Sequence, residues 1–186
     1  MKKVSNEINY PPQNIGSKDV IMYVFTSGTT GLPKPAVIKH SRYCAGGFTF
    51  FNTAGLNTSD VIYITLPIYH ANGAIIGVGT ALVSGTTIVL RKKFSASNFW
   101  KEIIENDCTA FIYVGEICRF LVNQPASPLD RMHKVKKAIG NGLRANVWRD
   151  FHKRFNIKCV EFYAASEGNC TMGKKIKYKF LLKKKA

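Results

Sequence analysis

Short apolar runs alternate with longer segments of helical character along most of the chain. The predicted strands are 20–25, 36–38, 61–64, 86–90, 109–114, 135–139 and 158–163. The predicted helices are 40–53, 73–83, 95–105, 115–123 and 145–155. Strands and helices that alternate across short connections predict an α/β fold, in which helices cover a mostly parallel sheet.

The uncharged stretch 71–90 allows two interpretations. Its twenty residues are enough to cross a membrane as a helix. Four glycines and several polar residues interrupt it, however, and Ser84-Gly85 divides it. We therefore expect a buried helix over 73–83, followed by a strand over 86–90.

The run at 20–25, which predicts a short buried strand, leads directly into a polar loop. The residues of this loop are Thr26, Ser27, Gly28, Thr29, Thr30, Gly31, Leu32, Pro33 and Lys34. Hydroxyl groups donate to phosphate oxygens, glycines let backbone N–H groups approach an anion, and the lysine adds a mobile positive charge. The segment therefore predicts a loop that holds the phosphates of a nucleotide. The alternative is a surface turn between two strands.

This loop does not have the pattern of a Walker phosphate-binding loop. A Walker loop ends in Gly-Lys followed by Ser or Thr, whereas Pro33 precedes Lys34 and Pro35 follows it. A proline here also discourages the helix that a Walker loop opens. The sequence therefore argues against a P-loop NTPase.

Three further polar or glycine-rich turns follow predicted strands. They are Leu66-Pro67-Ile68-Tyr69-His70, Gly140-Asn141-Gly142-Leu143-Arg144 and Tyr163-Ala164-Ala165-Ser166-Glu167-Gly168-Asn169. Ligands of open α/β sheets bind at the carboxyl ends of the strands. We therefore expect these turns and the phosphate loop to converge on one edge of the sheet.

The residue types in these turns suit a nucleotide site. Glu167, an acid just after a strand, can bind a magnesium ion that bridges ATP phosphates. Ser166 can hydrogen-bond the α-phosphate, and Tyr163 offers a ring face to the adenine. His70 is either a core or capping histidine or part of a substrate pocket, and the sequence leaves both open.

The formal charge of +16 does not by itself indicate a nucleic-acid-binding protein. Residues 174–186 hold seven lysines and no acid, so much of the excess lies in one terminal segment. Such a segment is typical of a solvated, disordered end. The other basic residues form no stripe interleaved with aromatic side chains, so we expect no specific binding of nucleic acid.

The order of residues in the phosphate loop resembles one family closely. The stretch from Phe25 to Lys34 is similar to the phosphate-binding loop of the adenylate-forming enzymes, and Tyr163 to Glu167 resembles their Tyr-Gly-Ala-Thr-Glu segment. Five further segments resemble the fatty acid transport proteins, which are very-long-chain acyl-CoA synthetases. These segments are 39–43, 66–70, 91–97, 115–120 and 140–144. The resemblance covers residues 17–173 and implies part of the large N-terminal domain of such an enzyme.

The resemblance also implies an activity and its site. Fatty acid and ATP give an acyl-adenylate and pyrophosphate, after which the CoA thiol displaces AMP. Thr26, Ser27, Thr29, Thr30 and Lys34 would surround the leaving pyrophosphate together with a magnesium ion on Glu167, where charge develops. The adenine pocket would be lined by Gly140, Asn141 and Gly142, and the acyl tunnel would be bordered by His70 and the helix at Gly73. Membrane association at the cytosolic face of the endoplasmic reticulum or plasma membrane is implied as well, and the lack of a predicted transmembrane segment leaves a cytoplasmic location as the alternative.

The sequence departs from the family pattern in two places within the site. Ala164 stands where glycine is usual, which would cost about 1 kcal/mol if the backbone there requires a positive φ. Ser166 replaces threonine but keeps the hydroxyl. Of the two, the change at Ser166 keeps the group that would bind phosphate.

The likeness ends near Gly173, where the lysine-rich segment begins. We divide the chain into a polar lead (1–16), a partial AMP-binding domain (17–173) and a lysine-rich tail (174–186). The family's downstream ribose-binding aspartate, hinge and C-terminal lysine have no counterpart here, which predicts a truncated splice form or gene model. The alternative to a ligase is a non-catalytic fragment that binds nucleotide, a partner or a membrane surface.

Overall fold

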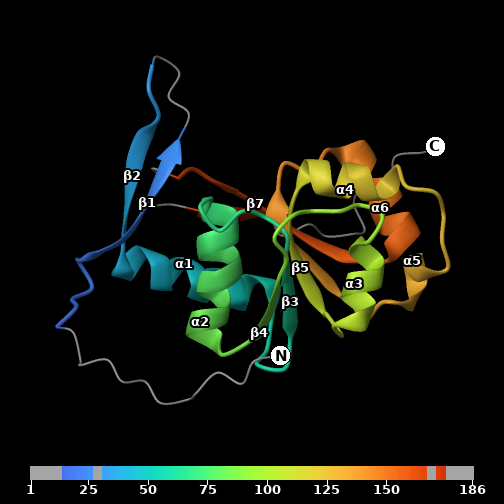
Figure 1. Cartoon of the computed structure of the whole chain (residues 1–186), viewed down its shortest axis with the longest axis horizontal. Coiled ribbons are helices and arrows are strands. Elements are labelled where there is room, and N and C mark those ends of the chain that lie inside the picture. The colour runs from blue at the N-terminus through green and yellow to red at the C-terminus, as the bar shows by residue number, and fades with distance from the viewer. Residues whose placement is uncertain (1–13, 27–30, 167–170, 175–186) are drawn as a thin grey trace.

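The computed structural model describes residues 14–26, 31–166 and 171–174, and its centre is a six-stranded sheet (Figure 1). The strand order is β4-β3-β5-β6-β7-β8. The strands are β3 (Val61–Ile64), β4 (Thr87–Leu90), β5 (Ala110–Val114), β6 (Lys137–Asn141), β7 (Lys158–Ala164) and β8 (Thr171–Lys174). Strands β3 to β7 are parallel, and β8 is antiparallel to β7. The predicted α/β fold is confirmed, whereas β8 was not predicted.

Helices cover both faces of this sheet (Figure 1). On one face lie α1 (His40–Ala54), the π-helix η1 (Asn72–Gly79) and α2 (Thr80–Ser84). On the other lie α3 (Phe99–Glu105), α4 (Gly115–Val122), α5 (Leu129–Met132) and α6 (Ala145–Phe155). Alternate residues of the parallel strands enter opposite cores: Ile112 packs with the first layer and Phe111 with the second. The period-2 pattern therefore fixes which helices each strand side chain meets.

Most predicted helices agree with the structure within a few residues. The exception is the segment 95–105, because the helix begins only at Phe99. Ser95 instead accepts the Asn98 backbone N–H at 3.3 Å in a turn that precedes the helix. The hydroxyl was correctly expected to cap a backbone N–H, but the helix that we placed after it starts later.

The uncharged stretch 71–90 folds as η1, α2 and β4 against the sheet. Ile76 packs in the core on one face of the sheet, and Gly85 ends α2 with a positive φ of 73°. This confirms the helix and strand expected there. Within the described residues, no helix is long and apolar enough to span a membrane.

Strands β1 (Val20–Thr26) and β2 (Lys34–Lys39) form a separate antiparallel hairpin that projects from the body (Figure 1). Its inner face, with Val24 and Ile38 fully buried, packs on α1 and η1. The outer face is exposed, with Tyr23 at 57% and Phe25 at 63%. The prediction of a buried strand was therefore wrong for most of this run, because four of the six residues 20–25 are exposed and the hairpin buries only one of its faces.

Candidate functional site

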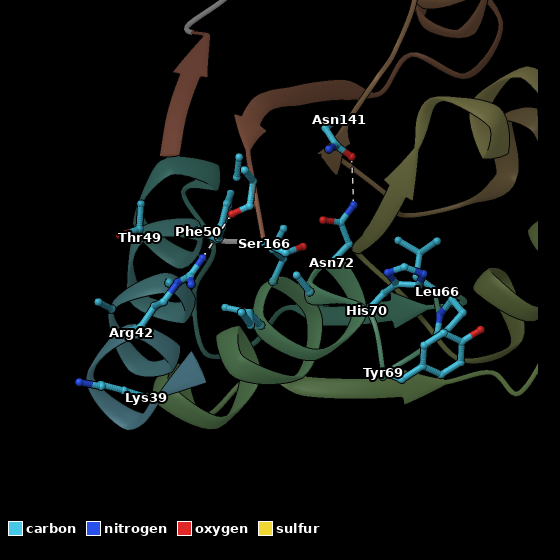
Figure 2. Close-up of a pocket in the computed structure, with 18 of the residues that line it drawn as sticks. Lys39, Arg42, Thr49, Phe50, Leu66, Tyr69, His70, Asn72, Asn141 and Ser166 are labelled. Atoms are coloured by element: carbon cyan, nitrogen blue, oxygen red, sulfur yellow. Dashed lines mark hydrogen bonds between the residues drawn. The ribbon is translucent and has the colours of Figure 1, made fainter. Parts of the chain in front are cut away.

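A cleft of about 1240 Å³ lies between α1, η1 and the carboxyl ends of the parallel strands. Leu66 and His70 come from the turn after β3, Val114 from the end of β5, Asn141 from the end of β6, and Ser166 from the turn after β7. Figure 2 shows Leu66, His70, Asn141 and Ser166 around one opening, with Arg42 on the side of α1. The expected convergence of the strand-end turns is thus confirmed for the turns after β3, β6 and β7.

We expected the phosphate loop to follow a strand of the parallel sheet. The structure places it elsewhere. It connects the two strands of the hairpin, whose β2 contributes Val37 and Lys39 to the cleft. Thr26 and Lys34 face each other at the end of the hairpin, where the Thr26 hydroxyl donates to the Lys34 carbonyl at 3.4 Å. The antiparallel pairing therefore corrects the predicted placement, and explains why the turn lies outside the six-stranded sheet.

Only part of this loop is described. Gly31 has a φ of 147°, and Lys34 is exposed at the start of β2. Neither Gly31 nor Lys34 lines the cleft as described. Ser27, Gly28, Thr29 and Thr30 lie outside the described residues, so the hydroxyls and glycines expected to bind phosphate stay a prediction.

The end of β7 brings Ala164, Ala165 and Ser166 to the cleft. Ala164 is not among the described residues with positive φ, so its methyl group meets no backbone strain. The cost that a positive φ would impose here therefore does not arise. Tyr163 is 66% exposed and does not line the cleft, and Glu167 lies outside the described residues.

The turn after β6 is held by a carboxylate that is not among the predicted site residues. Glu161 of β7 accepts the Leu143 backbone N–H at 3.0 Å and the Tyr113 hydroxyl at 2.5 Å. Burial is the main cause that raises the pKa of Tyr113 well above its usual value, and the neighbouring carboxylate raises it further. The Tyr113 hydroxyl therefore stays a hydrogen-bond donor. The feature of the sequence that could have revealed this role is Glu161 itself, an acid within the largely apolar run 158–163.

The same turn needs glycine for conformational reasons. Gly142 has a φ of 77°, a region that side chains with a Cβ rarely adopt. Gly140 lies buried in β6 directly before Asn141, which faces the cleft. Gly142 therefore lets the chain turn directly after Asn141, whose side chain faces the cleft.

A hydrogen bond crosses the cleft between η1 and β6. The Asn72 side-chain amide donates to the Asn141 side-chain oxygen at 3.0 Å (Figure 2). Gly73, the next residue, is buried against the turn after β3, where a Cβ would lie 2.4 Å from the Pro67 carbonyl oxygen. The predicted site residues Asn141, His70 and the helix at Gly73 are thus brought together, and Asn72 is an addition to the predicted set.

The charged groups of the described cleft lining are cationic. Lys39 and Arg42 line it, and no described lining residue is acidic. The Arg42 guanidinium donates to the Ala165 carbonyl at 3.3 Å. A cleft with polar amides, a serine hydroxyl and positive charge suits an anionic ligand that also has hydrogen-bonding edges, such as a nucleotide.

The described residues by themselves offer no metal site. No group of three or more His, Cys, Asp or Glu side chains within the described residues is placed to hold an ion. Magnesium prefers carboxylate and water oxygens, and the described lining supplies no carboxylate. The magnesium prediction therefore depends on Glu167.

Comparison with known proteins identifies relatives. The family of AMP-binding enzymes matches residues 2–180. The chain is 48% identical over 158 residues to human long-chain fatty acid transport protein 1, covering 84% of this chain and 24% of that protein. It is 50% identical over 158 residues to the medium/long-chain-fatty-acid–CoA ligase FadD6 of Mycobacterium tuberculosis, covering 83% and 26%. The chain thus spans about a quarter of the length of these relatives.

Solved structures share the fold. A malonyl-CoA ligase in complex with methylmalonyl-CoA and AMP has a TM-score of 0.77 at 22% identity, covering 84% of this chain and 35% of that one. The N-terminal domain of FACL13 from Mycobacterium tuberculosis has a TM-score of 0.75 at 23% identity, covering 85% and 40%. At these identities the likeness establishes the architecture alone.

Proposed function

The chain belongs to the AMP-binding enzyme family, and from this premise we propose that it is part of a long- or very-long-chain fatty acid–CoA ligase. Such a ligase activates a fatty acid with ATP through an acyl-adenylate and passes the acyl group to CoA. The observation that carries this proposal is the identity of 48% and 50% to a fatty acid transport protein and a fatty acid–CoA ligase. A link to fatty acid uptake is proposed on the same ground.

The cleft geometry supports a division of labour within this site. Asn141, presented by the turn between Gly140 and Gly142, would bind an adenine edge through its amide. Ser166, at the end of β7, would donate to the α-phosphate. His70 and η1 would border the acyl group, since Ile75 and Ile76 of that helix give the cleft an apolar wall. Tyr163 would cover the adenine face only after a rotation of its exposed side chain.

The pyrophosphate leaving group requires positive charge and hydrogen-bond donors where negative charge develops. We assign these to Thr26, Lys34 and the segment 27–30. Glu167 would hold the magnesium ion, which would neutralise phosphate charge when bound. The hairpin would then have to bring its tip to the phosphates.

Fatty-acid-dependent ATP–pyrophosphate exchange by the purified chain tests this proposal. We expect exchange that requires the fatty acid and is lost in Lys34→Ala and in Glu167→Ala. Lys18→Ala is the matched control, because Lys18 is exposed and lies apart from the cleft lining. Exchange by the wild-type chain no greater than that of Lys34→Ala would contradict ligase activity in this chain.

A second candidate is a non-catalytic domain that binds nucleotide or a membrane surface. The observation that favours it is the cleft lining, where Lys39 and Arg42 suit an anionic ligand and no described lining residue is acidic. Equilibrium binding of ATP with magnesium, without exchange, would support this candidate over the first.

A further inference from the structure

The Arg42 side chain joins two cleft walls that are far apart in sequence. Arg42 lies in the first turn of α1 and its guanidinium donates to the carbonyl of Ala165, 123 positions later (Figure 2). Ala164 is the last residue of β7, where it pairs with Thr171. Arg42 therefore holds the backbone at the point where it leaves the sheet.

We propose that Arg42 is a positioning residue for the turn that carries Ser166, an inference that rests on the proposed nucleotide site. The Ala165 carbonyl belongs to the peptide group that joins Ala165 to Ser166. Because a peptide group is planar, a hydrogen bond to that oxygen also fixes the direction of the Ser166 N–H. The backbone that carries the Ser166 side chain, which would meet the α-phosphate, is thus positioned from α1.

Helix α1 can position this turn because buried contacts fix the helix to both η1 and β7. The Tyr43 hydroxyl donates to the Ala74 carbonyl of η1 at 3.0 Å. The Phe50 ring packs edge-to-face on Phe162 of β7 with ring centroids 4.6 Å apart. The backbone at Arg42 is therefore held in place relative to β7, and the Arg42 guanidinium binds the chain just after that strand.

The charge of Arg42 gives this contact a second consequence. A hydrogen bond from a charged donor is stronger than one between neutral groups, and a guanidinium has a fixed planar geometry that an ammonium lacks. Arg42 and Lys39 also make the described lining cationic. A phosphate group beside Ser166 would therefore meet both an oriented hydroxyl and favourable charge.

Hydrogen–deuterium exchange of the full chain without nucleotide tests the positioning role directly. In Arg42→Met we expect the amides of 163–166 to exchange about tenfold faster, the loss expected for one charged hydrogen bond. The amides of β5 should keep their wild-type rates and serve as the internal reference for global stability. Arg42→Lys, which keeps a charged donor, should restore part of the protection. Ser41→Ala, on the same turn and lining the same cleft, should leave the exchange of 163–166 unchanged.

Titration with ATP and magnesium tests the consequence for binding. Arg42→Met should weaken ATP binding about tenfold, with a smaller loss in Arg42→Lys. Wild-type exchange at 163–166 in Arg42→Met would overturn the inference, as would equal acceleration in β5. If the wild-type chain binds no ATP while Arg42→Met still accelerates exchange only at 163–166, the proposed nucleotide site fails and the positioning of this turn by Arg42 stands.

Discussion

Glu161 is a carboxylate within a largely buried strand, and it connects three elements. It lies on β7, accepts a hydrogen bond from Tyr113 on β5, and accepts the backbone N–H of Leu143 after β6. A partly buried carboxylate is costly unless hydrogen bonds compensate for lost water. Here the compensating donors are the groups that shape the turn presenting Asn141.

Removing the Tyr113 hydroxyl should show how much these hydrogen bonds stabilise the fold. Tyr113→Phe leaves Glu161 without one of its donors, so we expect the free energy of unfolding to fall by about 1–2 kcal/mol. Urea denaturation, compared through the midpoint at an unchanged slope, measures the loss. Tyr23→Phe is the matched control, because that ring is exposed on the hairpin. Equal midpoints for Tyr113→Phe and the wild type would contradict this role for the hydroxyl.

At the scale of elements, periodicity predicted most of the fold. The strand 61–64 and the helix 145–155 agree with β3 and α6 at both ends, because each buries a clear apolar face or run. The hairpin was misplaced, since an apolar run does not reveal whether its partner strand is parallel or antiparallel. Strand β8 was missed because residues 171–174 contain no apolar run that would predict a strand. They join the sheet through backbone pairing with β7.

The same distinction applies to the candidate site. Strand-end turns could be predicted to converge, because parallel strands align their carboxyl ends. The contacts across the cleft, Asn72 with Asn141 and Arg42 with Ala165, join elements whose relative positions depend on helix packing. Sequence spacing carries no information about such contacts, so they required the structure.

The packing of η1 on the turn after β3 depends on the absence of a side chain at Gly73. A Cβ there would lie 2.4 Å from the Pro67 carbonyl oxygen, so backbone must move. We expect Gly73→Ala to lower the free energy of unfolding by about 1–3 kcal/mol. Gly16→Ala is the control, since a Cβ at that position meets only an ordinary contact at 3.6 Å. Denaturation midpoints that match for the two variants would rule out this close approach.

Asp60 ties together the starts of three strands. Its carboxylate accepts hydrogen bonds from the Asn57 N–H at 2.9 Å and the Thr109 hydroxyl at 2.6 Å, and pairs with Lys137 at 3.3 Å. Burial alone would raise the pKa of Asp60, but the hydrogen bonds and the lysine charge outweigh it and lower that pKa. Ionised Asp60 therefore stabilises the fold.

This shift has a defined pH dependence. Because the folded pKa lies below the unfolded one, the stabilisation is fully present above the unfolded pKa of about 3.9 and is lost as the pH falls through the folded pKa. We expect Asp60→Asn to be less stable than the wild type at neutral pH, with a difference that shrinks below about pH 4. Urea denaturation across this range measures the change. Glu105→Gln, in an exposed ion pair, should show little difference at any pH. A constant gap between Asp60→Asn and the wild type would refute the assignment.

At the scale of the whole molecule, the chain carries two features that differ in chemistry, one seen in the structure and one in the sequence. The outer face of the hairpin is apolar and exposed, whereas the sequence carries a net charge of +16 with seven lysines in 174–186. Apolar patches and basic segments both favour membrane surfaces, but only the basic segment responds to salt and to anionic lipid. Ionic strength therefore separates their contributions.

We expect the chain to sediment with vesicles that contain phosphatidylserine and to be released as salt rises, because lysine near an anionic surface contributes about 1 kcal/mol per residue. Removal of residues 174–186 should abolish most of this binding. A variant with Lys92→Ala and Lys93→Ala, which removes an exposed basic pair in the body, should retain it. Binding that survives loss of the tail but falls in Phe25→Ser would assign the attachment to the hairpin face instead. Equal sedimentation with neutral phosphatidylcholine vesicles would exclude an electrostatic origin.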